Sequence, residues 1–178
     1  MRKTWTIRFA LALVVAGVLD LASTYIASPD LALEANPFFI MLGRNWTYVI
    51  ASKVVGSLLA VVAFAGGLRI LQSRVDRLKG INGFVNVLSL LVFKRRVSFG
   101  EFALYGKFKD WPSALAVGGI AIGIAPITGG IAAAILNTFK VIQSQTQAII
   151  YGLGAAALGV GIALWLTYQF LVKQRKAA

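Results

Sequence analysis

The chain has 178 residues, of which 58% are hydrophobic, and its mean hydropathy is +0.79, which excludes an ordinary soluble domain and indicates a membrane protein. It has no cysteine and no histidine, so disulfides, thiolate chemistry and the commonest general base and metal ligand are excluded, and we expect no cofactor and no metal site. The net charge of +12 lies mainly beside apolar stretches, so we attribute it to membrane topology and anionic lipid headgroups and expect no nucleic-acid partner.

Four stretches are long enough to cross a bilayer, which takes about 20 helical residues. They cover residues of about 6–27, 46–71, 113–138 and 147–171. We therefore predict an all-α, polytopic membrane protein in which residues 1–178 form a single membrane domain. Most of the 18 basic residues lie at the chain ends or between the second and third spans, which places both termini in the cytoplasm by the positive-inside rule.

The first span begins like a secretory signal peptide, with basic residues before an apolar run. Arg8 interrupts that run, Asp20 falls where the hydrophobic region should end, and no clean cleavage site follows. We therefore expect the segment to persist as a membrane anchor.

Two opposite charges, Asp20 and Lys53, lie inside the first two spans. Each lies seven residues from the outer end of its span, a depth of about 10 Å at the helical rise of 1.5 Å per residue. Antiparallel helices joined by a short loop would bring both side chains to the same depth. Small residues share their helix faces, among them Ala16 and Gly17 in the first span and Gly56 and Ala60 in the second, which predicts that both faces contact helices and not lipid.

The loop between these spans adds further polar residues. Asn36 followed by Pro37 is typical of a helix start, and a loop that folds back would hold Glu34 over the two charges. The candidate functional cluster consists of Asp20, Thr24, Glu34, Asn36 and Lys53.

The spacing of this cluster resembles a known family. Asp20-x3-Thr24, then Glu34-x-Asn36-Pro37, then Lys53 is similar to a small prokaryotic integral membrane family that is catalogued as a domain of unknown function. The resemblance covers roughly residues 10–70 and leaves 72–178 outside it. It implies that the cluster works as a unit, but it supplies no reaction.

Two interpretations of the cluster stay open. Asp20 and Lys53 can neutralise each other and fix the register of the helices, a role in specificity that buried ion pairs can serve. They can also form a functional site, because ionisable groups inside a membrane are functional candidates by default.

The cytoplasmic segment 72–111 is predicted to hold one or two interfacial amphipathic helices. Apolar residues recur at helical spacing over 81–93, with Asn82, Asn86 and Ser89 on the other side. This run is too short to span, so it is predicted to be a helix lying in the interface or a re-entrant piece. Aromatic residues every third position over 99–108 predict a second such helix. The predicted contacts to anionic lipid headgroups are Lys94, Arg95, Arg96, Lys107 and Lys109. We favour a connector resting on the bilayer over a lipid-sensing or partner-docking segment.

The last two spans are rich in small residues. In the third, Pro126, Gly129 and Gly130 predict either a kinked packing helix, which we favour, or a helix break of the kind that binds ions in transporters. In the fourth, small residues four apart, such as Ala155 and Gly159, predict a close-packing face that is either internal or the seam of a homo-oligomer.

Three functions are compatible with this inventory. The favoured one is a membrane subunit or accessory component without its own chemistry, in a prokaryotic inner membrane, as a homo-oligomer or within a larger membrane complex. The second is a small oligomeric ion or proton transporter or channel that uses Asp20, Lys53 and Glu34. The third, least supported, is an intramembrane enzyme acting on a lipid or phosphate, for which no nucleophile motif or phosphate loop is present.

Overall fold

A computed structural model describes residues 2–32, 40–41, 43–78, 81, 83–96, 98, 109–139 and 145–177. The described residues form helices and no strand, which confirms the all-α prediction. The helices are α1 (Arg2–Ala27), α3 (Trp46–Gln72), α4 (Phe84–Phe93), α6 (Trp111–Thr138) and α7 (Gln145–Ala177), with a short 3-10 helix η1 (Val75–Leu78).

Four of these helices, α1, α3, α6 and α7, are long and apolar enough to cross a membrane. The apolar part of α7 covers Ile149–Gln174. Helix α1 begins at Arg2, earlier than the predicted span, and α7 continues to Ala177, beyond its predicted end, because the flanking basic residues are also good helix formers. The four-span prediction is therefore confirmed, with these changes of boundary.

Local signals fix where two of the long helices begin. Asn45 caps α3, and its side chain accepts a hydrogen bond of 2.8 Å from the backbone N–H of Thr47. Asp110 caps α6, and its carboxylate accepts one of 3.3 Å from the backbone N–H of Ser113. Pro112 in the first turn of α6 removes an N–H that would have no partner there.

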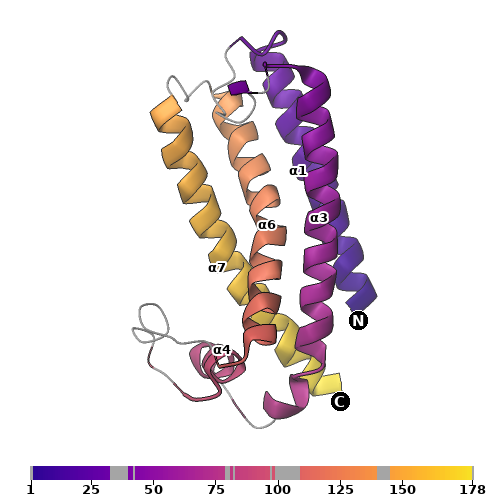
Figure 1. The fold of residues 1–178 in the computed structure, drawn as a ribbon, viewed down its shortest axis with the longest axis vertical. Coiled ribbons are helices and arrows are strands. Elements are labelled where there is room, and N and C mark those ends of the chain that lie inside the picture. Colours follow the sequence, from indigo (N-terminus) through magenta and orange to yellow (C-terminus); the bar gives the residue numbers. More distant parts are fainter. Residues whose placement is uncertain are drawn as a thin grey trace.

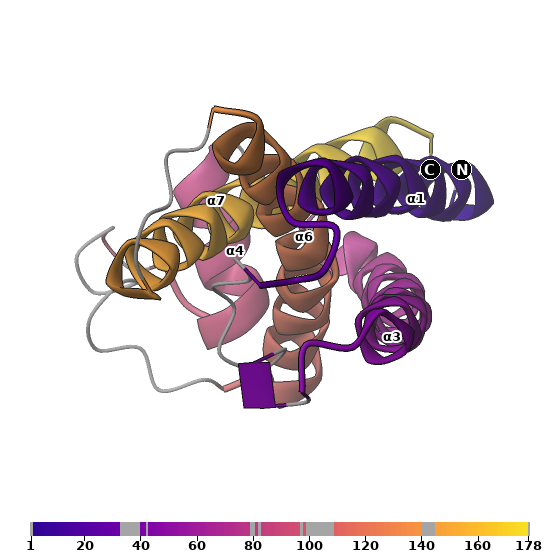
Figure 2. The same cartoon turned by 90° about the horizontal axis from the view of Figure 1, so that it is seen from above.

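The four long helices run alongside one another, and the two chain termini lie at the same end of the bundle (Figure 1). We call this the termini end, and the opposite end, where α1 leads into α3, the loop end. Helix α4 lies at the termini end (Figure 1). Seen along the bundle, α6 has α1, α3 and α7 around it (Figure 2).

Glycines allow close approach between α6 and the helices beside it. A Cβ at Gly130 of α6 would lie 3.0 Å from the carbonyl oxygen of Ala16, and one at Gly67 of α3 would lie 2.6 Å from that of Ala116. Helix α6 is continuous through Pro126, so the helix break considered for this span is absent and Gly130 serves in packing.

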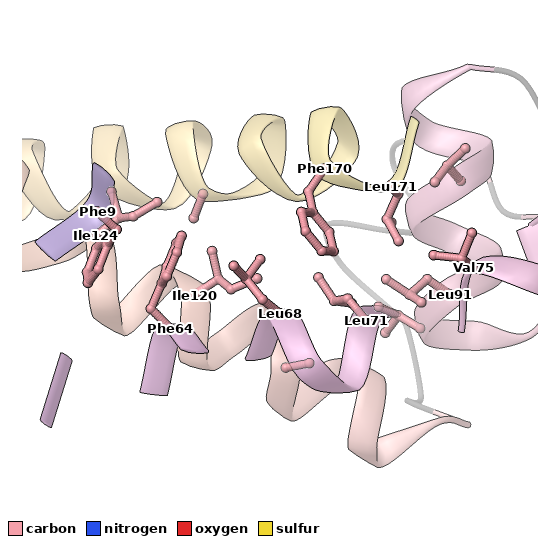
Figure 3. Packing of buried hydrophobic residues seen from close by; sticks show 14 of the residues in the cluster. Phe9, Phe64, Leu68, Leu71, Val75, Leu91, Ile120, Ile124, Phe170 and Leu171 are labelled. Carbon is pink, nitrogen blue, oxygen red and sulfur yellow. The ribbon is translucent and has the colours of Figure 1, made fainter. Parts of the chain in front are cut away.

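The hydrophobic core extends from the middle of the bundle to the termini end (Figure 3). Phe9 of α1 stacks on Phe64 of α3 with ring centroids 4.0 Å apart. Beyond this stack, Phe170 of α7 and Leu91 of α4 continue the core toward the termini end (Figure 3). The short helix α4 is thus part of the core of the bundle.

The helix predicted over 81–93 is therefore present, and it lies against the bundle. However, Ser89, expected on the solvated side, is 0% exposed, as is Val87. The Ser89 hydroxyl donates to the carbonyl of Asn86, which satisfies it without water. Helix α4 packs against the bundle on several sides, and its neighbours include Tyr168 of α7, whose ring contacts Phe84. The predicted second helix, over 99–108, lies outside the described residues.

Candidate functional site

Asp20 of α1 and Lys53 of α3 are in contact, and the Lys53 Nζ donates to the Asp20 Oδ2. The Asp20 side chain is 9% exposed, whereas the Lys53 side chain is 34% exposed. The pair is therefore asymmetric. Asp20 is enclosed by the bundle, and part of the Lys53 side chain is accessible at its surface.

A chain of hydrogen bonds connects this pair to α6. Asn137 of α6 donates from Nδ2 to the Thr24 hydroxyl at 3.1 Å and to the Ser23 hydroxyl at 3.4 Å. Ser23 in turn donates to the backbone carbonyl of Asp20 at 2.9 Å. Polar groups from α1, α3 and α6 thus meet at the loop end, and we call Asp20, Ser23, Thr24, Lys53 and Asn137 the loop-end cluster.

Asn137 was not singled out from the sequence. It is the one amide side chain in the predicted third span, and an amide inside an apolar span usually finds a partner on another helix. That signal was present, but it does not identify the partner helix. Glu34 and Asn36, which were predicted to complete the cluster, lie outside the described residues.

The described part of the loop folds onto the start of α3. The indole of Trp46 donates to the carbonyl of Pro29 at 2.7 Å, and Leu31 is fully buried against Val49. Asp30 accepts from the backbone N–H of Ala32 at 3.0 Å, and this bond, above all, lowers the pKa of the Asp30 carboxyl. Asp30 therefore acts as a charged turn residue outside the cluster.

A cavity of about 220 Å³ lies beside the pair, on the side of Lys53. Its walls come from three helices, and it is lined by Leu13 and Gly17 of α1, by Ser52, Lys53, Gly56 and Ser57 of α3, and by Pro126 of α6. The Asp20–Lys53 contact lies on one side of it along the bundle and the Phe9–Phe64 stack on the other. Helices α1 and α3 therefore touch at two levels and leave a space between them.

The small-residue faces beside the two charges contact α6 through Ala16 and Ala60, but Gly17 and Gly56 on the same faces make no such contact. A Cβ added at either glycine would meet no heavy atom within 4 Å, so neither brings the two helices together. The close approach is made by α6 instead, where a Cβ at Gly123 would lie 3.2 Å from the carbonyl oxygen of Ala60. The small residues beside the two charges line the cavity.

A second group of buried polar residues lies at the termini end. Asp110 is 5% exposed, and its Oδ1 lies 3.6 Å from a guanidinium nitrogen of Arg74. Four buried polar atoms at this end have no hydrogen-bond partner within the described part of the chain: Arg74 Nε, Ser113 Oγ, Thr167 Oγ1 and Gln174 Nε2. We call Arg74, Asp110 and Ser113 the termini-end cluster. Asp110 was not predicted from the sequence, although an Asp just before Trp111 and Pro112 is typical of a helix start.

The basic residues predicted to contact lipid headgroups lie at the same end. Lys94, Arg95, Arg96 and Lys109 are exposed, and Lys107 lies outside the described residues. Within the described residues, no three acidic, histidine or cysteine side chains gather as metal ligands would.

Comparison with known proteins adds no constraint on function. No family model, no curated protein and no solved structure matches the chain. The resemblance of residues 10–70 to a prokaryotic membrane family stays a prediction. The function must be argued from the geometry.

Proposed function

We propose that this protein is an integral membrane component, a subunit or accessory protein, that carries no reaction of its own and uses Asp20 and Lys53 to fix the register of α1 against α3. The observation that carries the proposal is the enclosure of Asp20, which is in direct contact with Lys53 on the next helix. A buried carboxylate engaged in this way is poorly placed to act as a base or to receive a proton from water.

The rest of the loop-end cluster supports the same role. Asn137 hydrogen-bonds both neighbouring hydroxyls of α1, so α6 is attached at the level of the pair. Side-chain hydrogen bonds between transmembrane helices stabilise association by roughly 0.6 kcal/mol on average and also select one arrangement. In this proposal the cluster specifies which helices meet, and the apolar core supplies most of the stability.

The partners in this proposal are lipids and other membrane proteins. The exposed Lys94, Arg95 and Arg96 would bind anionic headgroups of the cytoplasmic leaflet of a prokaryotic inner membrane. The loop-end half of α7, where Leu153 and Leu158 are exposed, would face lipid, a second copy or a subunit of a larger complex. Both termini would then lie in the cytoplasm.

A flux assay tests the proposal. Purified protein is placed in liposomes that enclose a pH-sensitive dye, and proton and potassium fluxes are followed under imposed gradients. We expect wild-type flux at the level of protein-free liposomes. Asp20→Asn is the diagnostic variant and Asp30→Asn its matched control, because Asp30 lies in the loop outside the cluster.

One observation favours a second candidate, ion or proton transport: the cavity reaches the Lys53 side of the pair. In that case wild-type liposomes would show flux that Asp20→Asn abolishes and Asp30→Asn retains. Such a result would overturn the structural role and make the pair a conduction site.

A further inference from the structure

The cavity beside Lys53 lies between two contacts that join α1 to α3. The Asp20–Lys53 pair lies on one side of it and the Phe9–Phe64 stack on the other. Pro126 of α6 contributes a third wall, so residues of three helices line the space.

The cavity opens to the surroundings of the bundle. Gly56 and Pro126, two of its lining residues, are exposed. The helix positions next to the lining residues carry exposed aliphatic side chains, Val14 and Val18 on α1 and Val55 on α3. In a chain whose four long helices are suited to crossing a membrane, such a rim faces lipid rather than water.

Its depth places it well inside the bilayer. Gly56 lies ten residues after Trp46, the first residue of α3, which corresponds to about 15 Å along the helix. With the boundary of the hydrocarbon core at Trp46 and a core about 30 Å thick, the cavity lies near the middle of the core. An occupant must therefore be soluble in the membrane, and a phospholipid headgroup would be too polar for this depth.

The polar lining defines the ligand's chemistry. Lys53 Nζ can donate further hydrogen bonds besides that to Asp20, and the Ser57 hydroxyl lies one helical turn further along the same wall. Since the carboxylate of Asp20 already balances the charge of Lys53, a second anion would be unbalanced. A neutral hydrogen-bond acceptor fits these donors best.

The size limits what can enter. Pockets that enclose a drug-sized ligand are roughly 300–1,000 Å³, whereas this one is about 220 Å³. It therefore accommodates one compact group, with the rest of the ligand lying between the helices and the lipid.

We propose that this cavity binds the carbonyl-bearing part of a neutral, membrane-soluble amphiphile, with its oxygen toward Lys53. Two kinds of membrane compound supply that chemistry, an isoprenoid quinone with ring carbonyls and a diacylglycerol with ester carbonyls. The inference goes beyond the proposed function, because it holds whether or not the protein conducts ions.

The experiment measures binding of three probes to the purified chain in detergent, by the shift of its thermal unfolding midpoint with probe concentration. The probes are decylubiquinone, dioctanoylglycerol, and decylbenzene, which has an apolar body but no acceptor. A ligand that binds only the folded protein raises its unfolding midpoint in a concentration-dependent way. We expect a saturable shift with at least one carbonyl probe and none with decylbenzene.

A matched pair of variants locates the site. Gly56→Leu fills the cavity, and Gly66→Leu makes the same change ten residues along α3, at a glycine that likewise has no atom within 4 Å of its Cβ position. We expect Gly56→Leu to weaken binding at least about tenfold, the equivalent of 1.4 kcal/mol, and Gly66→Leu to leave it unchanged. Gly17→Leu, on the opposite wall, repeats the test if the first variant does not fold.

Each outcome decides the matter. A shift with decylubiquinone alone assigns a quinone, a shift with dioctanoylglycerol alone assigns an ester lipid, and shifts with both support the shared carbonyl chemistry. The proposal is overturned if no carbonyl probe binds, if decylbenzene binds equally well, or if the two leucine variants behave alike.

Discussion

The two ends of the bundle handle buried polar groups in different ways. At the loop end, side chains of three helices bind one another: Lys53 contacts Asp20, and Asn137 donates to Ser23 and Thr24. At the termini end, Asp110 caps its own helix and lies near Arg74, but the Ser113 hydroxyl and the Arg74 Nε have no partner within the residues that the structure describes.

The difference teaches what each cluster contributes. At the loop end the buried apolar cluster is small, with Leu31 and Val49 at its centre, so directional polar contacts specify how the helices meet there. At the termini end the core is continuous through Leu71, Phe170 and Leu91, and it determines the arrangement there. Polar groups at that end therefore stabilise one helix start more than they connect helices.

Of the changes that test this comparison, the removal of Lys53 should lower the folding free energy most. Lys53→Met leaves the carboxylate of Asp20 enclosed without its partner, which costs about 3 kcal/mol of folding free energy. Unfolding of the purified protein in detergent by increasing SDS, followed by tryptophan fluorescence, measures the loss.

The double variant Asp20→Leu/Lys53→Met is the control. Because it removes both charges together, it should recover most of the lost stability. A double variant as unstable as the sum of its single variants would mean that the two side chains do not interact.

Substitutions of Asp110 should have the next largest effect on stability. They separate the contribution of the helix cap from that of the contact with Arg74. Asp110→Ala removes the cap of α6 and the partner of Arg74, and should cost about 1–2 kcal/mol of folding free energy. Asp110→Asn keeps an oxygen that can cap the helix, and should cost clearly less. The same SDS titration compares them, and equal losses would show that the Arg74 contact matters more than the cap.

The smallest effects come from single hydroxyls and sharpen the contrast between the two ends. Thr24→Val removes the acceptor of Asn137 and should cost about 0.6 kcal/mol. Ser113→Ala removes a hydroxyl without a described partner and should change stability by less than about 0.5 kcal/mol. If Ser113→Ala lost more stability than Thr24→Val in the same SDS titration, the assignment of interhelical contacts to the loop end would be contradicted.

The sequence was sufficient for the spans and for one long-range contact. Hydropathy located the four long helices because a span needs a long apolar run, and equal distances from the helix ends brought Asp20 and Lys53 to one depth. Both inferences depend on position along the chain, which the sequence states directly.

The choice of packing partner could not be predicted in the same way. The small residues beside Asp20 and Lys53 predicted faces that contact helices, and Ala16 and Ala60 on these faces do lie against Gly130 and Gly123 of α6, a partner that the sequence did not identify. A glycine in the sequence indicates that another helix can approach closely, but it does not identify which helix does so. Likewise, the spacing over 81–93 predicted a helix, but could not show that Ser89 on its polar side would be buried in the bundle.

The position of α6 against both α1 and α3 has a consequence for how the chain is made. During synthesis the first two helices enter the membrane before α6 exists, and their mutual contacts, the Asp20–Lys53 pair and the Phe9–Phe64 stack, lie entirely within the first 64 residues. Helices α1 and α3 can therefore pair before α6 is made. At that stage Ser23 and Thr24 have no hydrogen bond from Asn137, and the cavity lacks its Pro126 wall. Insertion of α6 would add both the Asn137 hydrogen bonds and the Pro126 wall. A ribosome stalled before α6 would therefore leave a hairpin of α1 and α3 whose cavity lacks one wall.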